Sequence, residues 1–253
     1  MNTAQLLGIA LRAAEKASKE ILSVYHADNF DVKLKGDQSP LTRADRLAHE
    51  AISAELIAAG FPILSEEGRT IPFNERKSWS YFWMVDPLDG TKEFIKRNDE
   101  FTVNIALIHA GKPILGVVAV PVTGDIYFGA SNEGAILRRG GTDMPLRKRA
   151  PIDLTASGLK VVASRSHMNE ATEQFIAKLD RAALVSAGSS LKFMLLAEGK
   201  ADVYPRFGPT MEWDTAAAHL IVNEVGMKVY QGDGKDELRY NKENLLNPDF
   251  LVR

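Results

Sequence analysis

The chain contains no cysteine among its 253 residues. This absence excludes disulfide bonds, thiolate metal sites and a cysteine nucleophile. The sequence also has no excess of positive charge, because 31 lysines and arginines stand against 33 aspartates and glutamates, for a formal net charge of −2. Nucleic acid is therefore not an expected partner, since the phosphate backbone is bound by basic surfaces. An anionic ligand would have to be attracted by a local site rather than by the overall field.

Long apolar runs are missing as well. No stretch reaches the ~18 apolar residues of a membrane-spanning helix. The N-terminal sequence TAQLLGIALRAAEKASKEILSVY carries charges along its length, unlike a secretory signal. We therefore expect a cytoplasmic protein with no integral membrane segment. The G-x-S-x-G elbow of serine hydrolases and the G-x-x-x-x-G-K-[ST] phosphate loop are also absent, so neither a hydrolase triad nor kinase chemistry is expected.

Two helices are predicted in the first sixty residues from the spacing of their apolar side chains. Apolar residues recur at helical intervals over 3–22, where Thr3 is the expected N-cap, and again over 44–59. Gly60 and Pro62 are expected to end the second helix, and a short strand should follow them.

The remaining pattern predicts an α/β protein in two halves. A continuous apolar run at 81–85 (YFWMV) indicates a strand buried on both faces. Three apolar runs over 101–138 predict an antiparallel meander. Beyond residue 158, strands alternate with helices, which is typical of an α/β unit. We therefore expect an α+β half over 1–150, followed by an α/β half over 151–253.

The acidic segment 86–91 (DPLDGT) follows the predicted buried strand directly. Asp86 and Asp89 are three residues apart on one short bend, so both carboxylates can face one point. Mg²⁺ prefers oxygen ligands of this kind, and a pair of close carboxylates suits two adjacent ions. Gly90 and Thr91 would open the next helix, whose N-terminal N–H groups could bind phosphate. An ordinary turn is the alternative, because D-P and D-G are common turn dipeptides.

Three more acidic positions stand where a predicted element begins or ends. Glu66 and Glu67 follow a short apolar strand, Asp45 lies near a helix start, and Asp214 opens an apolar helix. Taken alone, each has an ordinary structural interpretation. The pair could be a solvated acidic turn, Asp45 could be a first-turn acid, and Asp214 could be an N-cap.

Taken together, the acidic motifs resemble those of the inositol monophosphatase superfamily, whose members are magnesium-dependent, lithium-sensitive phosphatases. The matching stretches are 64–68 (LSEEG), 83–91 (WMVDPLDGT), 212–217 (EWDTAA) and 224–226 (EVG). Met227 departs from the pattern, because a second glycine usually follows Gly226. The resemblance covers nearly the whole chain. It implies a layered αβαβα sandwich of the inositol monophosphatase and fructose bisphosphatase type, with the metal site between the two halves.

The resemblance also implies which residues bind two to three Mg²⁺ ions. These ligands would be Glu66, Asp86, the carbonyl of Leu88, Asp89 and Asp214. Asp86 would bridge two of the ions. Asp45 and Thr91 would orient and deprotonate the attacking water, and Glu66 is counted with them as catalytic. Several carboxylates packed together would repel one another without cations, which agrees with a metal site.

Within the superfamily, the chain is most similar to the 3′(2′),5′-bisphosphate nucleotidases, which convert 3′-phosphoadenosine 5′-phosphate to AMP. The similarity rests on the stretches 36–42, 92–98, 163–167, 188–193 and 204–210. It implies a small phosphorylated nucleotide as the substrate. The implied contacts are Asp89, Gly90, Thr91, Ser164, His167, Gly188, Ser189, Lys192, Arg206 and Asp214.

These substrate contacts have structural alternatives too. Ser189 could be a helix N-cap, Lys192 and Arg206 could be solvated surface charges, and His167 could be incidental. For the whole protein, the alternatives are an inositol monophosphatase or a sugar bisphosphatase of the same superfamily, and a nucleotide or metal sensor without catalysis.

Three further expectations accompany the resemblance. The polar, glycine-containing loop 33–42 should close over the site. Relatives are often dimers, so a homodimer is expected, although the sequence shows no interface. Some relatives associate peripherally with the cytoplasmic face of the inner membrane, and nothing in the sequence demonstrates this here.

Overall fold

A computed structural model of the chain describes residues 2–27, 33–34, 40–163, 168–232 and 234–253. Residues 35–39 of the loop 33–42 lie outside the described residues, and so do Ser164 and His167. In the part of the chain that the structure describes, no helix combines the length and apolar character needed to cross a membrane.

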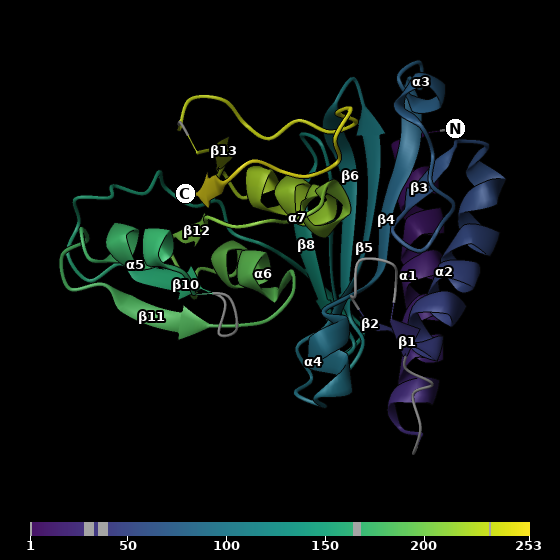
Figure 1. The fold of residues 1–253 in the computed structure, drawn as a ribbon, viewed down its shortest axis with the longest axis horizontal. Helices are drawn as coiled ribbons and strands as arrows, with labels where there is room; N and C mark the ends of the chain where they lie inside the picture. Colours follow the sequence, from purple (N-terminus) through teal and green to yellow (C-terminus); the bar gives the residue numbers. More distant parts are fainter. Residues whose placement is uncertain (1, 28–32, 35–39, 164–167, 233) are drawn as a thin grey trace.

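Helices and strands are mixed along the chain, with an unbroken run of strands from β5 to β10 (Figure 1). The helices are α1 (Thr3–Tyr25), α2 (Arg43–Leu56), the 3₁₀ turn η1 (Ile57–Ala59), α3 (Phe73–Arg76), α4 (Thr91–Ile95), α5 (Glu170–Ile176), α6 (Leu191–Ala197) and α7 (Glu212–Glu224). The strands of the first half are β1 (Lys33–Leu34), β2 (Pro40–Leu41), β3 (Ile63–Ser65), β4 (Tyr81–Asp89), β5 (Thr102–His109), β6 (Lys112–Val120), β7 (Asp125–Ala130), β8 (Gly134–Arg139) and β9 (Thr142–Pro145). Those of the second half are β10 (Lys160–Ala163), β11 (Ala183–Ser186), β12 (Tyr204–Arg206), β13 (Val229–Gln231) and β14 (Phe250–Val252).

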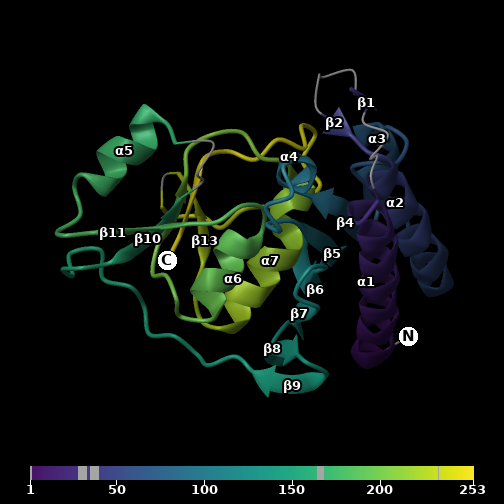
Figure 2. The same ribbon diagram turned by 90° about the horizontal axis from the view of Figure 1, so that it is seen from below.

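These elements stack in five layers, as the resemblance implies (Figures 1 and 2). Helices α1 and α2 cover one face of a seven-stranded sheet of order β3-β4-β5-β6-β7-β8-β9. Helices α6 and α7 cover the other face. Strands β10 to β14 form the fourth layer, in which a parallel bridge between Val161 and Val203 links β10 to the start of β12. Helix α5 lies outside this layer (Figure 1).

The first helix begins one residue earlier than the sequence predicts. Asn2, rather than Thr3, is the N-cap of α1, and its side chain accepts a hydrogen bond from the Gln5 N–H at 2.9 Å. The Gln5 side chain in turn accepts from the Asn2 N–H, which completes a capping box. The capping box thus satisfies two N–H groups. With Thr3 as the N-cap, the bond from the N-cap N–H to the side chain of the third helical residue would not form.

The large sheet extends beyond the predicted meander. Strands β5, β6 and β7 match the three apolar runs, but the sheet continues through β8 and β9. The sequence analysis missed these two strands because they lie toward the sheet edge. The end of β8 carries Arg138 and Arg139, and all four residues of β9 are exposed.

One continuous core joins the two predicted halves. Met84 and Ala106 of the large sheet belong to the same buried cluster as Phe193 and Ile221 of α6 and α7. Residues 146–159 contain no helix or strand, so the expected boundary between the α+β half and the α/β half falls in an irregular segment. The division of the chain into an α+β half over 1–150 and an α/β half over 151–253 stays a prediction.

Helix α7 approaches the large sheet closely enough to require glycine at one position. A Cβ on Gly116 of β6 would lie 2.4 Å from the carbonyl oxygen of Ala217 in α7. This contact places the first turn of α7 beside the ends of β3 and β4.

Candidate metal centre and active site

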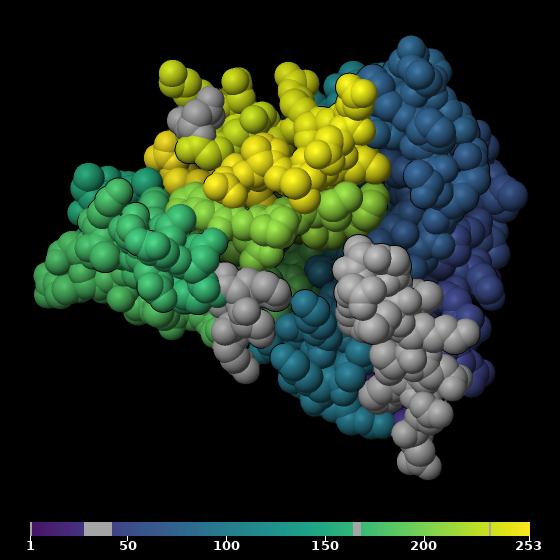
Figure 3. All heavy atoms as spheres, in the orientation of Figure 1, coloured from purple at the N-terminus to yellow at the C-terminus, as the bar shows by residue number. Residues whose placement is uncertain are grey.

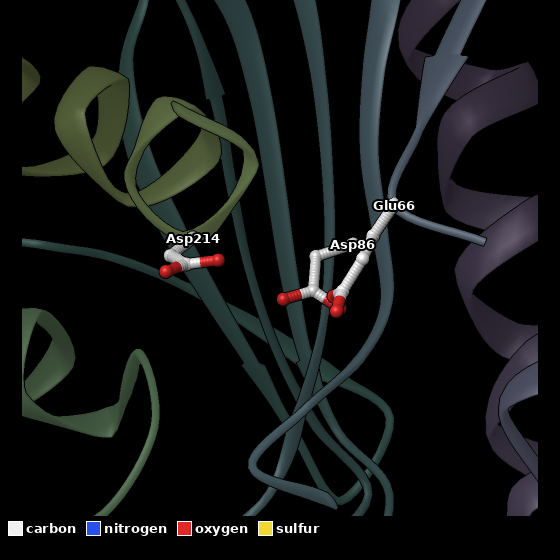
Figure 4. A group of neighbouring side chains, drawn as sticks. All are labelled: Glu66, Asp86 and Asp214. Atoms are coloured by element: carbon white, nitrogen blue, oxygen red, sulfur yellow. The ribbon is translucent and has the colours of Figure 1, made fainter. Parts of the chain in front are cut away.

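Three carboxylates from distant parts of the chain meet between the sheet and α7. Strands β3 and β4 are parallel neighbours, so Glu66, which follows β3, reaches the same sheet edge as Asp86 in β4. Asp214 comes from the first turn of α7. One carboxylate oxygen of each residue lies within 4.8 Å of the others. Figure 4 shows Glu66 and Asp86 side by side, with Asp214 across from them.

Burial makes this group of carboxylates costly when it is fully ionised. Asp86 is 1% exposed. Burial raises the pKa of Asp86 well above its ordinary value, and the charges of Glu66, Asp89 and Asp214 raise it further. Burial also raises the pKa of Asp214, with the charge of Asp89 as the next cause. A bound divalent cation would offset this repulsion, so the residues suit a hard cation with oxygen ligands.

Asp89 lies beside the three-carboxylate group but outside it. Its Oδ2 accepts hydrogen bonds from the hydroxyls of Ser189 and Ser190, both at 2.9 Å. Longer bonds come from Thr102 at 3.5 Å and the Asn104 side-chain amide at 3.4 Å. These contacts tie the end of β4 to β5 and to the start of α6. The sequence predicts that the carboxylates of Asp86 and Asp89 can face one point. In the structure Asp89 is not one of the three clustered carboxylates, but its charge raises the pKa of Asp86.

Asp45 and Thr91 also lie together, although they are 46 residues apart in sequence. The Thr91 hydroxyl donates to Asp45 Oδ1 at 3.1 Å and lies 3.3 Å from the carbonyl oxygen of Leu88. The other carboxylate oxygen of Asp45 accepts from the Thr42 N–H at 2.7 Å and the Thr42 hydroxyl at 2.6 Å. Asp45 is therefore the partner of the N-cap Thr42 in the capping box of α2 and, at 1% exposed, is not a solvated first-turn acid; it also faces the turn after β4.

A cavity of about 120 Å³ lies next to these acidic side chains. Its lining includes Asp89, Gly90, Gly188, Ser189, Lys192, Tyr204, Arg206 and Asp214. Gly90 has φ +93°, and a Cβ there would lie 3.1 Å from the carbonyl oxygen of Glu100. Figure 3 shows this face hollowed where the green second half meets the blue first half.

Two cationic side chains form the far wall of this cavity. Lys192 is 7% exposed, so it is not a solvated helix charge. Its Nζ donates to the carbonyl oxygen of Ser189 at 2.6 Å, and burial lowers the pKa of Lys192 to about 8. Arg206 donates from Nη2 to the carbonyl oxygen of Pro209 at 2.9 Å. Its buried Nε finds no acceptor in the described part of the chain.

The proposed N-cap alternatives for Ser189 and Asp214 are wrong. Ser190 occupies the N-cap position of α6 and makes no side-chain capping bond, while the Ser189 hydroxyl points to Asp89. Asp214 is the third residue of α7, which starts two residues earlier than predicted, and its carboxylate accepts from the Met211 N–H at 2.8 Å. Ser189 thus makes a tertiary contact with Asp89, whereas Asp214 takes the third position in the capping box of α7.

Sequence reasoning missed several polar residues around the site. Thr102 and Asn104 occupy alternate positions of the otherwise apolar strand β5, and both lie within hydrogen-bond reach of Asp89. Two polar residues at alternate positions of a buried strand lie on the same face of the sheet, and buried polar groups require partners. This pattern could have indicated a polar site on that face. The buried carboxylate of Glu212 was also missed, although it stands inside the EWDTAA motif.

Comparison with known proteins gives a consistent result. The model of the inositol monophosphatase family matches residues 2–250. The 3′(2′),5′-bisphosphate nucleotidase CysQ of Escherichia coli K12 is 44% identical over 250 residues, which cover 98% of this chain and 99% of that protein. CysQ of Haemophilus influenzae is 34% identical and covers 98% and 92% of the two chains.

Solved structures resemble the fold over almost the same length. The crystal structure of CysQ from Bacteroides thetaiotaomicron has a TM-score of 0.87 and 47% identity, covering 98% of this chain and 96% of that one. An inositol monophosphatase from Thermotoga maritima shares the fold with a TM-score of 0.78 at 22% identity, covering 97% and 91%. The five layers, the acidic group and these matches agree, and the chain belongs to the inositol monophosphatase family.

Proposed function

We propose that the protein is a metal-dependent phosphatase that hydrolyses 3′-phosphoadenosine 5′-phosphate to AMP and phosphate, as a 3′(2′),5′-bisphosphate nucleotidase. The observation that carries this proposal is a group of three carboxylates, one of which, Asp214, also lines a cavity together with Asp89, Lys192 and Arg206. A cavity with acidic and basic walls suits a substrate with two phosphates, one at each wall. Relatives named for this activity are 33% to 44% identical over nearly the full chain.

Magnesium is the cofactor that we propose, with two to three ions. The donors at the site are oxygens, and hard divalent cations prefer such ligands. The proposed ligands are Glu66, Asp86, the carbonyl of Leu88, Asp89 and Asp214. Bound magnesium would polarise the scissile phosphate and lower the pKa of the attacking water.

The chain's own residues would handle the proton of that water. The Thr91 hydroxyl donates to Asp45 Oδ1, which leaves the Thr91 oxygen free to accept a proton from water. We assign Asp45 and Thr91 as the pair that orients and deprotonates the water, with Glu66 beside them. The water oxygen then bonds to phosphorus while its proton passes to the Thr91–Asp45 pair. The P–O bond to the ribose oxygen breaks, and that oxygen takes up a proton from solvent to leave as the 3′-hydroxyl of AMP.

The second phosphate of the substrate is proposed to bind at the cationic wall. Lys192 and Arg206 supply positive charge there, and Gly188 leaves room because a Cβ would lie 3.0 Å from Glu100 atoms. Ser164 and His167 are proposed contacts on the family resemblance alone. A homodimer, a cytoplasmic location and the division into two halves near residue 150 also stay predictions.

A substrate panel tests the proposed function. Phosphate release with Mg²⁺ would be measured from 3′-phosphoadenosine 5′-phosphate, inositol 1-phosphate and fructose 1,6-bisphosphate. We expect a strong preference for the adenosine bisphosphate, because it is the only one of the three that carries a base together with two phosphates, one for each wall. Preference for the inositol or sugar phosphate would overturn the substrate but keep the phosphatase. Binding of the nucleotide without phosphate release from any compound would indicate a sensor.

Replacing Arg206 with alanine should affect a substrate with the second phosphate more than a substrate without it. We expect kcat/KM for 3′-phosphoadenosine 5′-phosphate to fall about 10- to 100-fold, since a charge-assisted hydrogen bond contributes ~1.5–3 kcal/mol. Turnover of 3′-AMP, which lacks the second phosphate, should change less than about threefold. The matched control is Arg181→Ala, whose side chain is 81% exposed. Equal losses on both substrates would contradict the proposed role of Arg206.

A further inference from the structure

Helix α7 carries a polar stripe that the catalytic proposal does not use. Thr215, His219 and Asn223 are spaced four residues apart, so they lie on one face of the helix. Thr215 is 1% exposed and His219 is 2% exposed. The stripe contacts residues 237–247, which we call the α7 brace. Figure 1 shows this yellow segment running across α7.

The hydrogen bonds between the stripe and the brace have a definite direction. Glu237 can only accept, so His219 Nε2 donates to it at 3.1 Å. Burial lowers the pKa of His219, which keeps the imidazole neutral, and its Nδ1 must then accept from the Tyr240 hydroxyl at 2.9 Å. The Tyr240 oxygen lies 3.3 Å from the Thr215 hydroxyl, next to Asp214. The chain of bonds thus ends at the first turn of α7.

A buried carboxylate fastens the same turn to the brace. Glu212 is fully buried. It accepts from the Asn241 N–H at 2.6 Å, the Lys242 N–H at 3.0 Å and the Lys242 Nζ at 2.5 Å. A buried charge with this many donors is held in one position, because breaking any of the bonds leaves it poorly solvated.

Asn247 closes the brace around the residues next to Asp214. Its side-chain amide donates to the carbonyl oxygen of Met211 at 2.8 Å and to the Thr215 hydroxyl at 3.1 Å. The Met211 N–H donates in turn to the Asp214 carboxylate. The residues on both sides of Asp214 are therefore held by the brace.

We propose that the α7 brace sets the position of Asp214 and thereby the metal affinity of the site, with Tyr240 as a positioning residue. The inference rests on the proposed metal-dependent function, since it assigns Asp214 to a metal. Groups that orient metal ligands typically change affinity 10- to 100-fold when they are removed. The Tyr240 hydroxyl touches no proposed ligand and acts through Thr215 and His219.

The test is the affinity for Mn²⁺, measured by calorimetry on the full chain with Tyr240→Phe. The matched control is Tyr127→Phe, since Tyr127 is 3% exposed and its hydroxyl also makes a hydrogen bond, to Glu198 at 2.7 Å. Tyr240→Phe loses the bond to His219 and the longer contact with Thr215, and Tyr127→Phe loses the bond to Glu198, so both variants should have a lower Tm. We expect about tenfold weaker Mn²⁺ binding only in Tyr240→Phe. Wild-type affinity in Tyr240→Phe, or equal weakening in both variants, would overturn the proposal.

A second pair of variants tests the proposal if Tyr240→Phe does not fold. His219→Gln keeps an acceptor for Tyr240 and a donor for Glu237, whereas His219→Leu keeps neither. We expect the glutamine variant to bind Mn²⁺ more tightly than the leucine variant, and equal affinities would overturn the inference. Binding is measured without turnover, so a protein that binds Mn²⁺ as expected but releases no phosphate would refute only the proposed function. No Mn²⁺ binding by the wild type would overturn both.

Discussion

Replacing Asp86 with asparagine is expected to abolish phosphate release and to stabilise the metal-free protein. Asp86 is the most buried of the three clustered carboxylates, and all the neighbouring charges that raise its pKa are acidic. Loss of this ligand should reduce kcat at least about a thousandfold, or ~4 kcal/mol of transition-state stabilisation. Without metal, the substitution removes repulsion and the cost of burying a charge, so Tm should rise by ~2–4 °C for each kcal/mol regained. Phosphate release and thermal unfolding in EDTA measure the two effects.

Asp125→Asn is the matched control for this substitution. Asp125 is also buried, at 8% exposed, but it accepts three hydrogen bonds from Arg139. Here the asparagine breaks a favourable ion pair, so Tm should fall while phosphate release stays near the wild-type rate. An Asp86→Asn variant with wild-type turnover, or one that is less stable than the wild type in EDTA, would contradict the metal assignment.

The acidic group could be predicted because its members stand at the ends of regular elements. A parallel pair of strands brings the residues that follow each strand to one sheet edge, which is how Glu66 meets Asp86. Local pattern placed Asp45 and Thr91 near helix starts, and the resemblance supplied the link between them. The roles of these residues stay predictions, although their proximity is now described.

What the sequence could not provide is the set of partners that each polar side chain finds across the fold. Asp89 is bonded to hydroxyls about 100 positions away in the chain, and Tyr240 reaches His219 from a segment without regular structure. Periodicity reports which face of an element is buried, but not which loop covers that face. The burial of Lys192 was missed for the same reason, since a lysine near a helix start is usually solvated.

Chelation of metal should abolish phosphate release and lower Tm, and the loss in Tm should grow with pH. Asp86 and Asp214 both have raised pKa values in the folded protein. Above the ordinary aspartate pKa of 3.8, the unfolded chain has released protons that the folded chain still holds. The metal-free protein therefore loses stability as pH rises from that value through the folded-state pKa. Mg²⁺ binds the ionised carboxylates and adds ~2.7 kcal/mol at a concentration 100 times its Kd.

Other titrating groups must be separated from this effect. Burial lowers the pKa of His49 and of His219, so their contributions make the folded protein more stable as pH rises toward 6.5. The pKa of Glu237 is lowered to about 2, which affects stability only below pH 4.5. The decisive quantity is therefore the difference in Tm between the wild type and Asp86→Asn, both in EDTA, because the histidine contributions cancel in that difference.

This difference should move further against the wild type as the pH rises from 3.8 through the raised folded-state pKa of Asp86. Over that range the folded wild type still has the Asp86 proton to lose, while asparagine has none. Added Mg²⁺ should make the Tm of the wild type the higher of the two, because only the wild type keeps the Asp86 carboxylate that would bind the cation. A difference independent of pH would mean that Asp86 is not buried among like charges in solution, and an unchanged Tm on adding Mg²⁺ to the wild type would refute the metal site.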